Sequence, residues 1–580
     1  GSWGNWYILP GDTTFTPDPF NSSEFLPTLG PNDIPGTWSI TSYTGPGTVN
    51  TGNAANYFAD VNDPRSEFFG PGGDYVLTWT TPNNGNGGDC ASNVNVTLAD
   101  CATLDCDGEK DNVTFRNNYD RNNNDFSFEV WIKPDPTTNS NTPNDPIQTI
   151  LSKRDATDLT HGYDLRLQGT SLSFNFNNGG NITASHALST SRWYHVAVTY
   201  SGGTYTLYVD GLQVGTGGGA APANNNFEFI LGAMDQAAAG GNPNPVNYYS
   251  GWMQELRIWD AQLAVEQIRQ MMNQRIQDNG GATRGAVVPI DVAGLNWNSL
   301  RAYYQMVQGS EVVGGYLIPT AGTSAIDGQL RNIETWQEET APLPYLTKVN
   351  GNWNTTGAGT PWLYGDSVWD HPNSTGINGG AIDWNIAQIS HDVISNTQDV
   401  TMLGLLTDTN TELTVTNAGT QDENNIGHGL WVTHYLKLDV QLDLDGESQL
   451  VQKRYTPTQV SESILDVTSS GYLERDQQGA TNYFNYNYWS SPVSAINPWV
   501  NNAGHNVDMI LRDGTNSANP LPLNWTESYD PNPNTSGKTL SRRWIYAYLN
   551  STSNTYANWR YLREVLYFKV GIGYTMKGSG

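Results

Sequence analysis

The sequence has few charged residues, and basic residues are the scarcer kind. Charged side chains make up 15% of the 580 residues, compared with roughly 25% in an average globular protein. The chain has 28 Lys and Arg residues against 57 Asp and Glu residues, a formal charge of −29. Because such a surface repels phosphate backbones, we exclude nucleic acid as a partner.

Cysteine is rare and long apolar runs are missing. The three cysteines, Cys90, Cys101 and Cys106, permit at most one internal disulfide, and both a Cys101–Cys106 pair and three reduced thiols remain open. No run of 18 apolar residues occurs, so we expect no membrane span. The ends lack a signal peptide and a sorting signal, so we expect a piece of a larger, exported polypeptide.

Glycine and short polar residues are plentiful instead. The 60 Gly residues, with many Asn, Thr and Ser, favour turns and strands, and 37% hydrophobic residues suffice for packed cores. The length predicts about three or four units. The sequence therefore predicts an all-β, multidomain protein.

Residues 36–100 contain short alternating strands, for example 75–80, between Gly, Pro and Asn clusters, and this predicts a small antiparallel sandwich. Asn62-Asp63-Pro64, Phe69-Gly70, the strand at 75–79 and Cys90 follow one another in this segment. This order resembles the immunoglobulin-like repeats of very large bacterial surface adhesins.

Five motifs follow in a fixed order between residues 104 and 259. They are LDCDG at 104–108, FEVWIKP at 128–134, WYHVA at 193–197, LYVDG at 207–211 and SGWMQELRIW at 250–259. The strands alternate cleanly, and Asp210-Gly211 predicts a hairpin turn. Together the motifs resemble a laminin-G-like, concanavalin A-like jelly roll. Asp260 is expected to cap a short helix with Leu263, Ile268 and Met271 or Met272 facing inward.

Short apolar strands recur between residues 381 and 452, the last of them expected at 436–444. They predict a β-solenoid or, alternatively, a second sandwich. Further motifs are LERDQQG at 473–479, YNYWSSPV at 486–493 and LRDG at 511–514. These are similar to the region before the sorting domain of giant Bacteroidota surface proteins that the type IX secretion system exports, gliding-motility adhesins among them. The resemblance implies an extracellular location on the bacterial outer surface.

The sequence thus divides into six predicted segments. They are an N-terminal extension or the end of a preceding repeat (1–35), an immunoglobulin-like β-sandwich (36–100), a laminin-G-like jelly roll with a C-terminal helix (101–279), a linker (280–345), a β-solenoid-like region (346–460) and a β-rich region before the sorting domain (461–580).

The laminin-G resemblance also implies a structural Ca²⁺, because such folds often hold one beside their first and last strands. The implied ligands are Asp105, Asp107 and Asp111, with Asp235 as an outer ligand. Carboxylate oxygens are the ligands that Ca²⁺ prefers. The sequence departs from the family at Cys106, where an aromatic residue is usual, and at Gln254, where an Asp is frequent.

Aromatic side chains are the candidates for ligand binding, because sugar rings stack on them. Tyr248, Tyr249 and Trp252 form one local set, and the segment 483–489 contains another. The alternative role of such residues is packing between strands.

Motifs for catalysis are missing. Glu129 has Trp131 rather than a carboxylate two positions on, and His195 lies inside a strand. A possible exception is Asp439, Asp443 and Asp445, which would share one face of a continuous strand. We therefore predict a non-enzymatic adhesin segment that binds glycan or protein surfaces through its jelly roll. The alternatives are a polysaccharide-degrading enzyme with its carboxylates at 436–447, and a spacer in an extracellular fibre.

Overall fold

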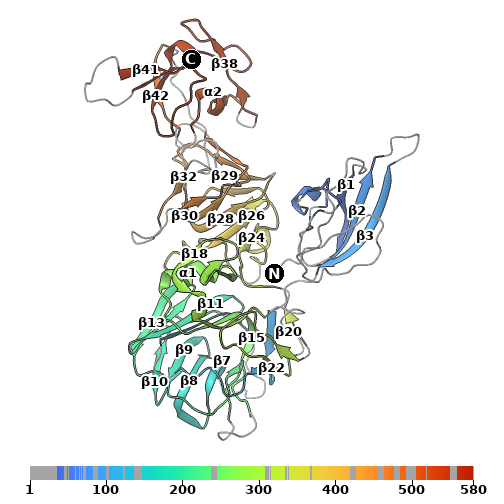
Figure 1. Ribbon diagram of the computed structural model, residues 1–580, viewed down its shortest axis with the longest axis vertical. Helices are drawn as coiled ribbons and strands as arrows, with labels where there is room; N and C mark the ends of the chain where they lie inside the picture. The colour runs from blue at the N-terminus through green and yellow to red at the C-terminus, as the bar shows by residue number, and fades with distance from the viewer. Residues whose placement is uncertain are drawn as a thin grey trace.

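The computed structural model is nearly all β and has several sheets. It describes residues 36–578 apart from single positions and short gaps, so the predicted extension 1–35 lies outside the described residues. The longer gaps are 45–48, 83–88, 99–102, 122–124, 136–146, 237–243, 307–311, 366–368, 418–425, 455–462, 476–481, 492–503 and 549–557. Jelly roll, solenoid and C-terminal unit follow one another along the long axis, with the N-terminal sheet to one side (Figure 1).

The N-terminal unit is an antiparallel sheet of β1 (Thr37–Thr44), β2 (Gly73–Thr81) and β3 (Cys90–Leu98). Its small core is aromatic, and Trp38 stacks on Phe58 with ring centroids 5.6 Å apart. Within the described part of residues 36–98 there is one sheet, whereas the predicted sandwich has two. The reason is that Phe58 and Phe68, from the connecting segment, cover the apolar face of the sheet.

The jelly roll consists of two facing sheets. Sheet A contains β13 (Leu212–Gly218), β12 (Thr204–Val209), β11 (Tyr194–Ser201), β6 (Phe126–Pro134), β15 (Ser250–Trp259), β4 (Thr103–Asp107) and β23 (Trp336–Gln337) in this order, with β19 (Leu300–Tyr304) also on β15. Sheet B contains β10 (Gly180–Thr183), β9 (Ser171–Phe176), β8 (Asp158–Gln168), β7 (Ile147–Asp155), β14 (Ile230–Leu231), β5 (Asn112–Thr114), β22 (Gly328–Arg331), β21 (Tyr316–Leu317) and β20 (Val312–Val313).

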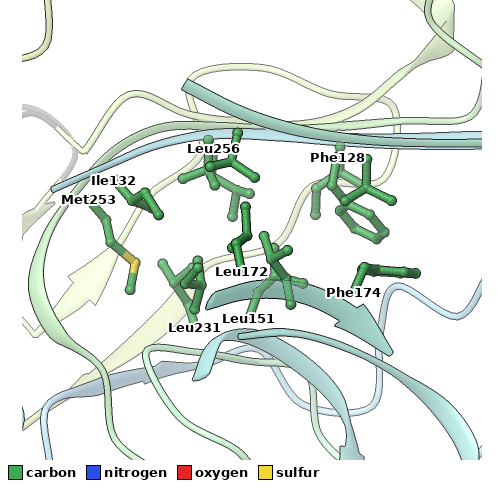
Figure 2. Close-up of a cluster of buried hydrophobic side chains, with 14 of the residues drawn as sticks. Phe128, Ile132, Leu151, Leu172, Phe174, Leu231, Met253 and Leu256 are labelled. Atoms are coloured by element: carbon green, nitrogen blue, oxygen red, sulfur yellow. The ribbon is translucent and has the colours of Figure 1, made fainter. Parts of the chain in front are cut away.

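The space between these two sheets is filled with apolar side chains. Phe128 and Ile132 of β6 and Met253 and Leu256 of β15 face Leu151, Leu172, Phe174 and Leu231 of sheet B (Figure 2). All of them are at most 1% exposed. Side chains alternate along each strand, so every second one points into the space between the two sheets. Burial of their apolar surface stabilises the jelly roll by roughly 25 cal/mol per Å².

The segment 280–345, expected as a linker, belongs largely to the jelly roll. Strand β19 pairs with β15, β22 pairs with β5, and β23 pairs with β4. Tyr304 of β19 lies in the core, where its hydroxyl is 2.6 Å from that of Tyr119. The segment is therefore held by ladder hydrogen bonds as well as by apolar burial. A separate small sheet contains β16 (Ile276–Asn279), β17 (Ala282–Gly285) and β18 (Asp291–Asn296).

The expected helix forms, but Asp260 does not cap it. Helix α1 (Val265–Met272) begins after Ala264, whose backbone N–H donates to Oε1 of Gln267. Asp260 instead forms ion pairs with Arg121 and Arg301. Two arginines compete for that carboxylate, so the helix starts four residues later than the sequence suggested. Its buried side chains are Ile268, Met271 and Met272.

Residues 345–475 form stacked parallel coils, so of the two predicted alternatives the pairing is that of a solenoid. One sheet contains β24 (Tyr345–Leu346), β26 (Ile386–Ile389), β28 (Val400–Thr407), β30 (Gly429–Lys437) and β32 (Gln449–Gln452), with β33 (Ile464–Leu465) also on β30. The other contains β25 (Gly351–Asn352), β27 (Val393–Ser395), β29 (Glu412–Val415), β31 (Gln441–Leu444) and β34 (Tyr472–Arg475). The chain alternates between the two sheets, and apolar side chains fill the interior.

The expected continuous strand 436–444 is wrong, because the chain turns from one sheet to the other at residues 438–440. The Oγ1 atom of Thr407 accepts the backbone N–H groups of Asp439 and Val440 at this corner. These hydrogen bonds replace ladder bonds at the point where β30 ends. Asp439 consequently lies outside the strand that carries Asp443.

Jelly roll and solenoid share one apolar core. Trp131, Trp193 and Met272 of the former pack in the same cluster as Trp384 and Ile386 of the latter. The amide of Asn385 donates to Oδ1 of Asn273, and the indole N–H of Trp384 donates to the carbonyl of Asp210. The buried His434 lies with Nε2 3.0 Å from Nε2 of Gln270 in α1. We call this contact region the seam.

The C-terminal unit has its own small core around Ile545, Ala547 and Met576. Its main sheet has the order β35 (Tyr486–Trp489), β42 (Tyr574–Lys577), β40 (Tyr546–Tyr548) and β41 (Trp559–Tyr561). The remaining elements are α2 (Val507–Ile510), β36 (Arg512–Asp513), β37 (Leu521–Pro522), β38 (Asn524–Thr526) and β39 (Thr539–Ser541). Within the described residues, no helix has the length and apolar character needed to cross a membrane.

The cysteines do not form the pair that was one of the two alternatives. Cys106 is a free thiol that points into the jelly-roll core, and burial raises its pKa well above the usual range. A side chain that faces the core cannot at the same time reach back along its own segment. Cys90 is free and exposed, and Cys101 lies outside the described residues.

Candidate functional site

The outer face of sheet B carries a set of polar side chains that lie mostly out of water. Leu165 and Leu167 of β8 point into the core, so Asp164 and Arg166 between them point to the other face. The same alternation along β7 and β9 adds five more residues. We call the whole set the polar face: Thr149, Ser152, Arg154, Asp164, Arg166, Ser173 and Asn175.

Strand register arranges these side chains in two cross-strand rows. In the first row Thr149 is opposite Arg166, and Arg166 is opposite Ser173. In the second row Ser152 is opposite Asp164, and Asp164 is opposite Asn175. Tyr248 extends the first row, because it forms an isolated β-bridge with Thr149. Opposite residues in a sheet share a face, so the two rows form one contiguous polar surface.

Asp164 is the centre of this surface. Its carboxylate is fully buried and lies 2.9 Å from Nη1 of Arg154 and 3.5 Å from Nε of Arg166. The amide of Asn175 donates to the same carboxylate at 3.0 Å. Burial raises the pKa of Asp164, although the two guanidinium groups and the amide act in the opposite direction. A buried carboxylate is tolerated here because three donors surround it.

Several polar atoms of this face have unused hydrogen-bonding capacity. Thr149 is fully buried, and its hydroxyl has no hydrogen-bond partner within the part of the chain that the structure describes. The same holds for Nε of Arg154 and Nε of Arg166. An unpaired buried donor costs about 1–3 kcal/mol.

The predicted ligand-binding aromatics divide between two locations. Tyr248 is half-buried and lies at the end of the first row of the polar face, where burial raises its pKa. Tyr249 is fully buried in the jelly-roll core. Trp252 lies on the outer face of sheet A, with the Lys133 ammonium 3.4 Å from its ring centroid and the Trp193 ring 6.0 Å away. Of these three aromatic residues, only Tyr248 therefore lies beside the polar face.

Three of the four predicted calcium ligands lie in one segment. The carboxylate of Asp111 accepts the N–H of Asp107 at 2.9 Å and the amide of Asn332 at 3.1 Å. Burial raises the pKa of Asp111 to about 7, so a cation would have to displace a proton. Asp235 instead accepts the N–H groups of Gln236 and Asn244.

Across residues 36–578, gaps excepted, no three His, Cys, Asp or Glu side chains are grouped as a metal site. The hydrogen-bond partners of Asp111 and Asp235 are backbone N–H groups and, at Asp111, also the side-chain amide of Asn332. The calcium site therefore stays a prediction.

Glu129 and His195 belong to a buried charged network under α1. Both side chains are at most 2% exposed, and Nε2 of His195 lies 3.5 Å from the Glu129 carboxylate. Trp259 donates to Glu129 at 3.0 Å, and Arg257 lies 3.5 Å from it. Burial alone would raise the pKa of Glu129, but these three partners outweigh burial and lower it. Arg257 also donates to the Met271 carbonyl, which fixes the helix on the sheet.

The solenoid carboxylates are not grouped as the continuous strand would have placed them. Asp439 lies at the corner, paired with Lys437 and with the N–H of Ser470. Asp443 lies in β31 opposite Glu474, and Asp445 follows the strand and is 3% exposed. Asp439 therefore does not share a strand face with Asp443 and Asp445.

Sequence reasoning missed the polar face itself. The available signal was the alternation in Tyr163, Leu165 and Leu167 on one side against Asp164 and Arg166 on the other. Charged residues at alternate positions are normally solvent-exposed, and a sequence does not reveal that such a side chain is buried.

The fold is that of a concanavalin A-like jelly roll, and the comparison with protein families agrees. Residues 107–269 match the family described as the concanavalin A-like lectin/glucanases superfamily. The matched segment includes the polar face and the network around Glu129.

Similar solved structures include carbohydrate-related proteins and a pentraxin. A putative carbohydrate binding protein from Bacteroides ovatus is 18% identical, with 53% of this chain and 89% of that chain covered and a TM-score of 0.31. The heptameric SAP-like pentraxin from Limulus polyphemus is 18% identical over 30% and 82% of the two chains, with a TM-score of 0.24. Domain 4 of an extracellular arabinanase from Geobacillus stearothermophilus is 16% identical over 40% and 97%, with a TM-score of 0.22.

Proposed function

We propose that this chain is a non-enzymatic segment of an exported surface adhesin, and that its jelly roll binds glycan through the polar face of sheet B. The observation that carries the proposal is the arrangement of Asp164, Arg166 and Asn175 in two cross-strand rows, with the Arg154 guanidinium paired to Asp164. The match of residues 107–269 to the lectin/glucanase superfamily supports it.

The polar face offers the groups that bind sugar hydroxyls. The two guanidinium groups supply donors, and the single carboxylate of Asp164 supplies an acceptor. Adjacent hydroxyls of a sugar ring offer the same combination. Arg166 is the accessible member, with 21% of its side chain exposed, and Tyr248 at the end of the row supplies an aromatic flank.

The same geometry argues against catalysis on this face. Acid–base hydrolysis of a glycosidic bond uses two carboxyl groups on opposite sides of the scissile bond. Asp164 is held between Arg154 and Arg166 and is fully buried, so it is poorly placed to donate or accept a proton. Binding without turnover is the function that this arrangement supports.

A glycan array probed with the native chain and with Arg166→Ala tests the proposal. We expect the variant to lose binding by about tenfold or more, since removing a donor leaves buried sugar and protein groups unpaired. Arg331→Ala is the matched control, because Arg331 is an exposed arginine of the same sheet. Each array is run with calcium and with a chelator, which also tests the predicted cation.

Three results would contradict the proposal. Equal binding by the native chain and Arg166→Ala would place the glycan elsewhere on the chain. No binding to any glycan or cell surface, with or without calcium, would favour the spacer role. Release of sugar products by the native chain would favour the enzyme, and Asp443→Asn would then have to abolish it.

A further inference from the structure

We infer a second glycan-binding face, on the main sheet of the C-terminal unit and separate from the jelly roll. This inference does not depend on the proposed function of the polar face. The sheet β35-β42-β40-β41 buries one side against the small core around Ala547, Tyr574 and Met576. Its other side carries aromatic residues, several of them exposed to solvent.

The strand register fixes which residues share this outer side. Tyr546 lies opposite both Thr575 and Tyr561, and Tyr548 lies opposite Trp559. On the other edge, Tyr486 lies opposite Lys577 and Tyr488 lies opposite Thr575. We call these eight residues the aromatic face: Tyr486, Tyr488, Tyr546, Tyr548, Trp559, Tyr561, Thr575 and Lys577.

The rings of this face are accessible. Tyr488 is 74% exposed, and Tyr486, Tyr561 and Tyr548 are 41%, 38% and 37% exposed. Burying an aromatic side chain contributes more than burying any other type, so four such rings on one sheet are costly to leave in water. Two edge strands, β35 and β41, carry three of them, which spreads the exposed rings over the full width of the sheet.

Neighbouring side chains hold the rings in fixed orientations. The centroids of Tyr546 and Tyr561 are 5.2 Å apart, and those of Tyr548 and Trp559 are 5.3 Å apart. At the other edge the Lys577 ammonium lies 4.1 Å from the ring centroid of Trp544 and 5.8 Å from that of Tyr486. Cross-strand and cation–π contacts of this kind reduce the rotamer entropy that binding would otherwise cost.

The composition of the face selects a neutral polysaccharide as its occupant. Six of the eight residues are Tyr or Trp, and none is Leu, Ile, Val or Met. Protein interfaces are enriched in Met and Arg as well as in aromatic residues, and neither Met nor Arg is among the eight residues. Single-stranded nucleic acids also stack their bases on aromatic rings. This protein, however, has a net charge of −29, and Lys577 is the one cation among the eight residues, so it would repel a nucleic acid.

The distribution of the rings over three strands, β35, β40 and β41, narrows the ligand class further. The pyranose rings of a β-1,4-linked polysaccharide expose flat C–H surfaces along an extended chain. Such a ligand can contact rings on several strands at once, and tyrosine hydroxyl groups at the rim can bind its hydroxyls.

Titration calorimetry of the full chain with cellohexaose, xylohexaose and chitohexaose tests the inference. We expect binding of at least one, and a loss of about tenfold in affinity for Tyr488→Ala and for Tyr561→Ala. Tyr488→Trp should retain the affinity, because it keeps a flat ring. Tyr567→Ala is the matched control: Tyr567 is 66% exposed in the same unit but lies outside the four strands.

Thermal unfolding of each variant checks that it is folded. We expect the variants to fold, because the substituted tyrosines are exposed at the surface. Arg331→Ala, at an exposed arginine of the jelly roll outside both faces, should leave binding of these oligosaccharides unchanged. Failure of the native chain to bind any of the three sugars would overturn the inference, as would equal binding by all variants. It would also be overturned if Tyr488→Ala changed self-association in sedimentation or binding to oligo(dT) while leaving sugar binding intact.

Discussion

Single buried residues set the pH range in which this protein is stable. His434 at the seam is 4% exposed, and burial lowers its pKa from about 6.5 to about 4. The unfolded chain, with an ordinary histidine pKa, therefore takes up this proton first as the pH falls. The stabilising contribution is present in full above about pH 6.5, is lost progressively toward pH 4, and amounts to ~3 kcal/mol at most.

Urea unfolding of the native chain and of His434→Gln between pH 4 and 7 measures this effect. Glutamine does not titrate and can keep a hydrogen bond to Gln270. We expect the free energies of unfolding of the two proteins to converge at low pH, because carboxylates common to both change both equally. Parallel pH profiles would contradict the assignment to His434.

The sequence predicted only part of the site, and Tyr248 and Tyr249 show why. The sequence identified both as aromatic candidates, but adjacent residues in extended backbone point to opposite sides. One ring lies beside the polar face and the other lies in the core. Which is which depends on the strand's partner, and a single sequence does not specify that partner.

At the scale of elements, the late strands β19, β22 and β23 complete the jelly roll. Ala302, Tyr304, Met306 and Leu317 from this segment are fully buried in its core. Removing large core side chains costs about 2–5 kcal/mol each, and whole domains are stable by only about 5–15 kcal/mol.

We therefore expect a fragment of residues 101–279 to aggregate or to lack a cooperative thermal transition, whereas residues 101–475, which keep the late strands and the seam, should fold. Size-exclusion chromatography and circular dichroism during heating compare the two fragments directly. A stable monomeric fragment 101–279 would show that the late strands are an accessory. The additional strand edges that it exposes on β4 and β5 add to the expected aggregation.

The sequence predicted which segments form strands better than it predicted which strands pair with each other. Alternation predicted the strands of the jelly roll, because one buried face imposes a period of two. It could not show that β19 pairs with β15, some 45 residues earlier. The corner at 438–440 was missed because Leu438 and Val440 continue the apolar alternation through the turn.

At the scale of the whole molecule, the seam makes the jelly roll and the solenoid one cooperative unit. Trp384 is central to it: its ring packs under the Arg269 guanidinium at 3.7 Å and its N–H bonds to Asp210. Because the two parts share a core, we expect a single calorimetric transition for both.

Trp384→Ala should separate that transition into two and destabilise the solenoid by about 3–5 kcal/mol. Differential scanning calorimetry resolves the two cases. Trp431→Ala is the control, since Trp431 lies on β30 and contacts Lys453 rather than the jelly roll. One transition in both variants, or two in the native chain, would contradict a shared core.

The arrangement of units was only partly predictable. Composition and motifs predicted a jelly roll followed by repeated short strands, and the parallel pairing decides for the solenoid. The seam depends on contacts such as Asn273 with Asn385, which are 112 residues apart. No local pattern marks either residue, so this contact required the structure.

The parallel coils also determine how the molecule would respond to mechanical force. A load applied through the C-terminal unit reaches the last coil first, where β32 and β34 are each held by one row of hydrogen bonds to β30 and β31. That coil can detach while the coils behind it and the shared core stay folded. Releasing its roughly 30 residues would lengthen the chain by about 100 Å. Under tension the solenoid would extend in steps, and the jelly roll would keep its shape.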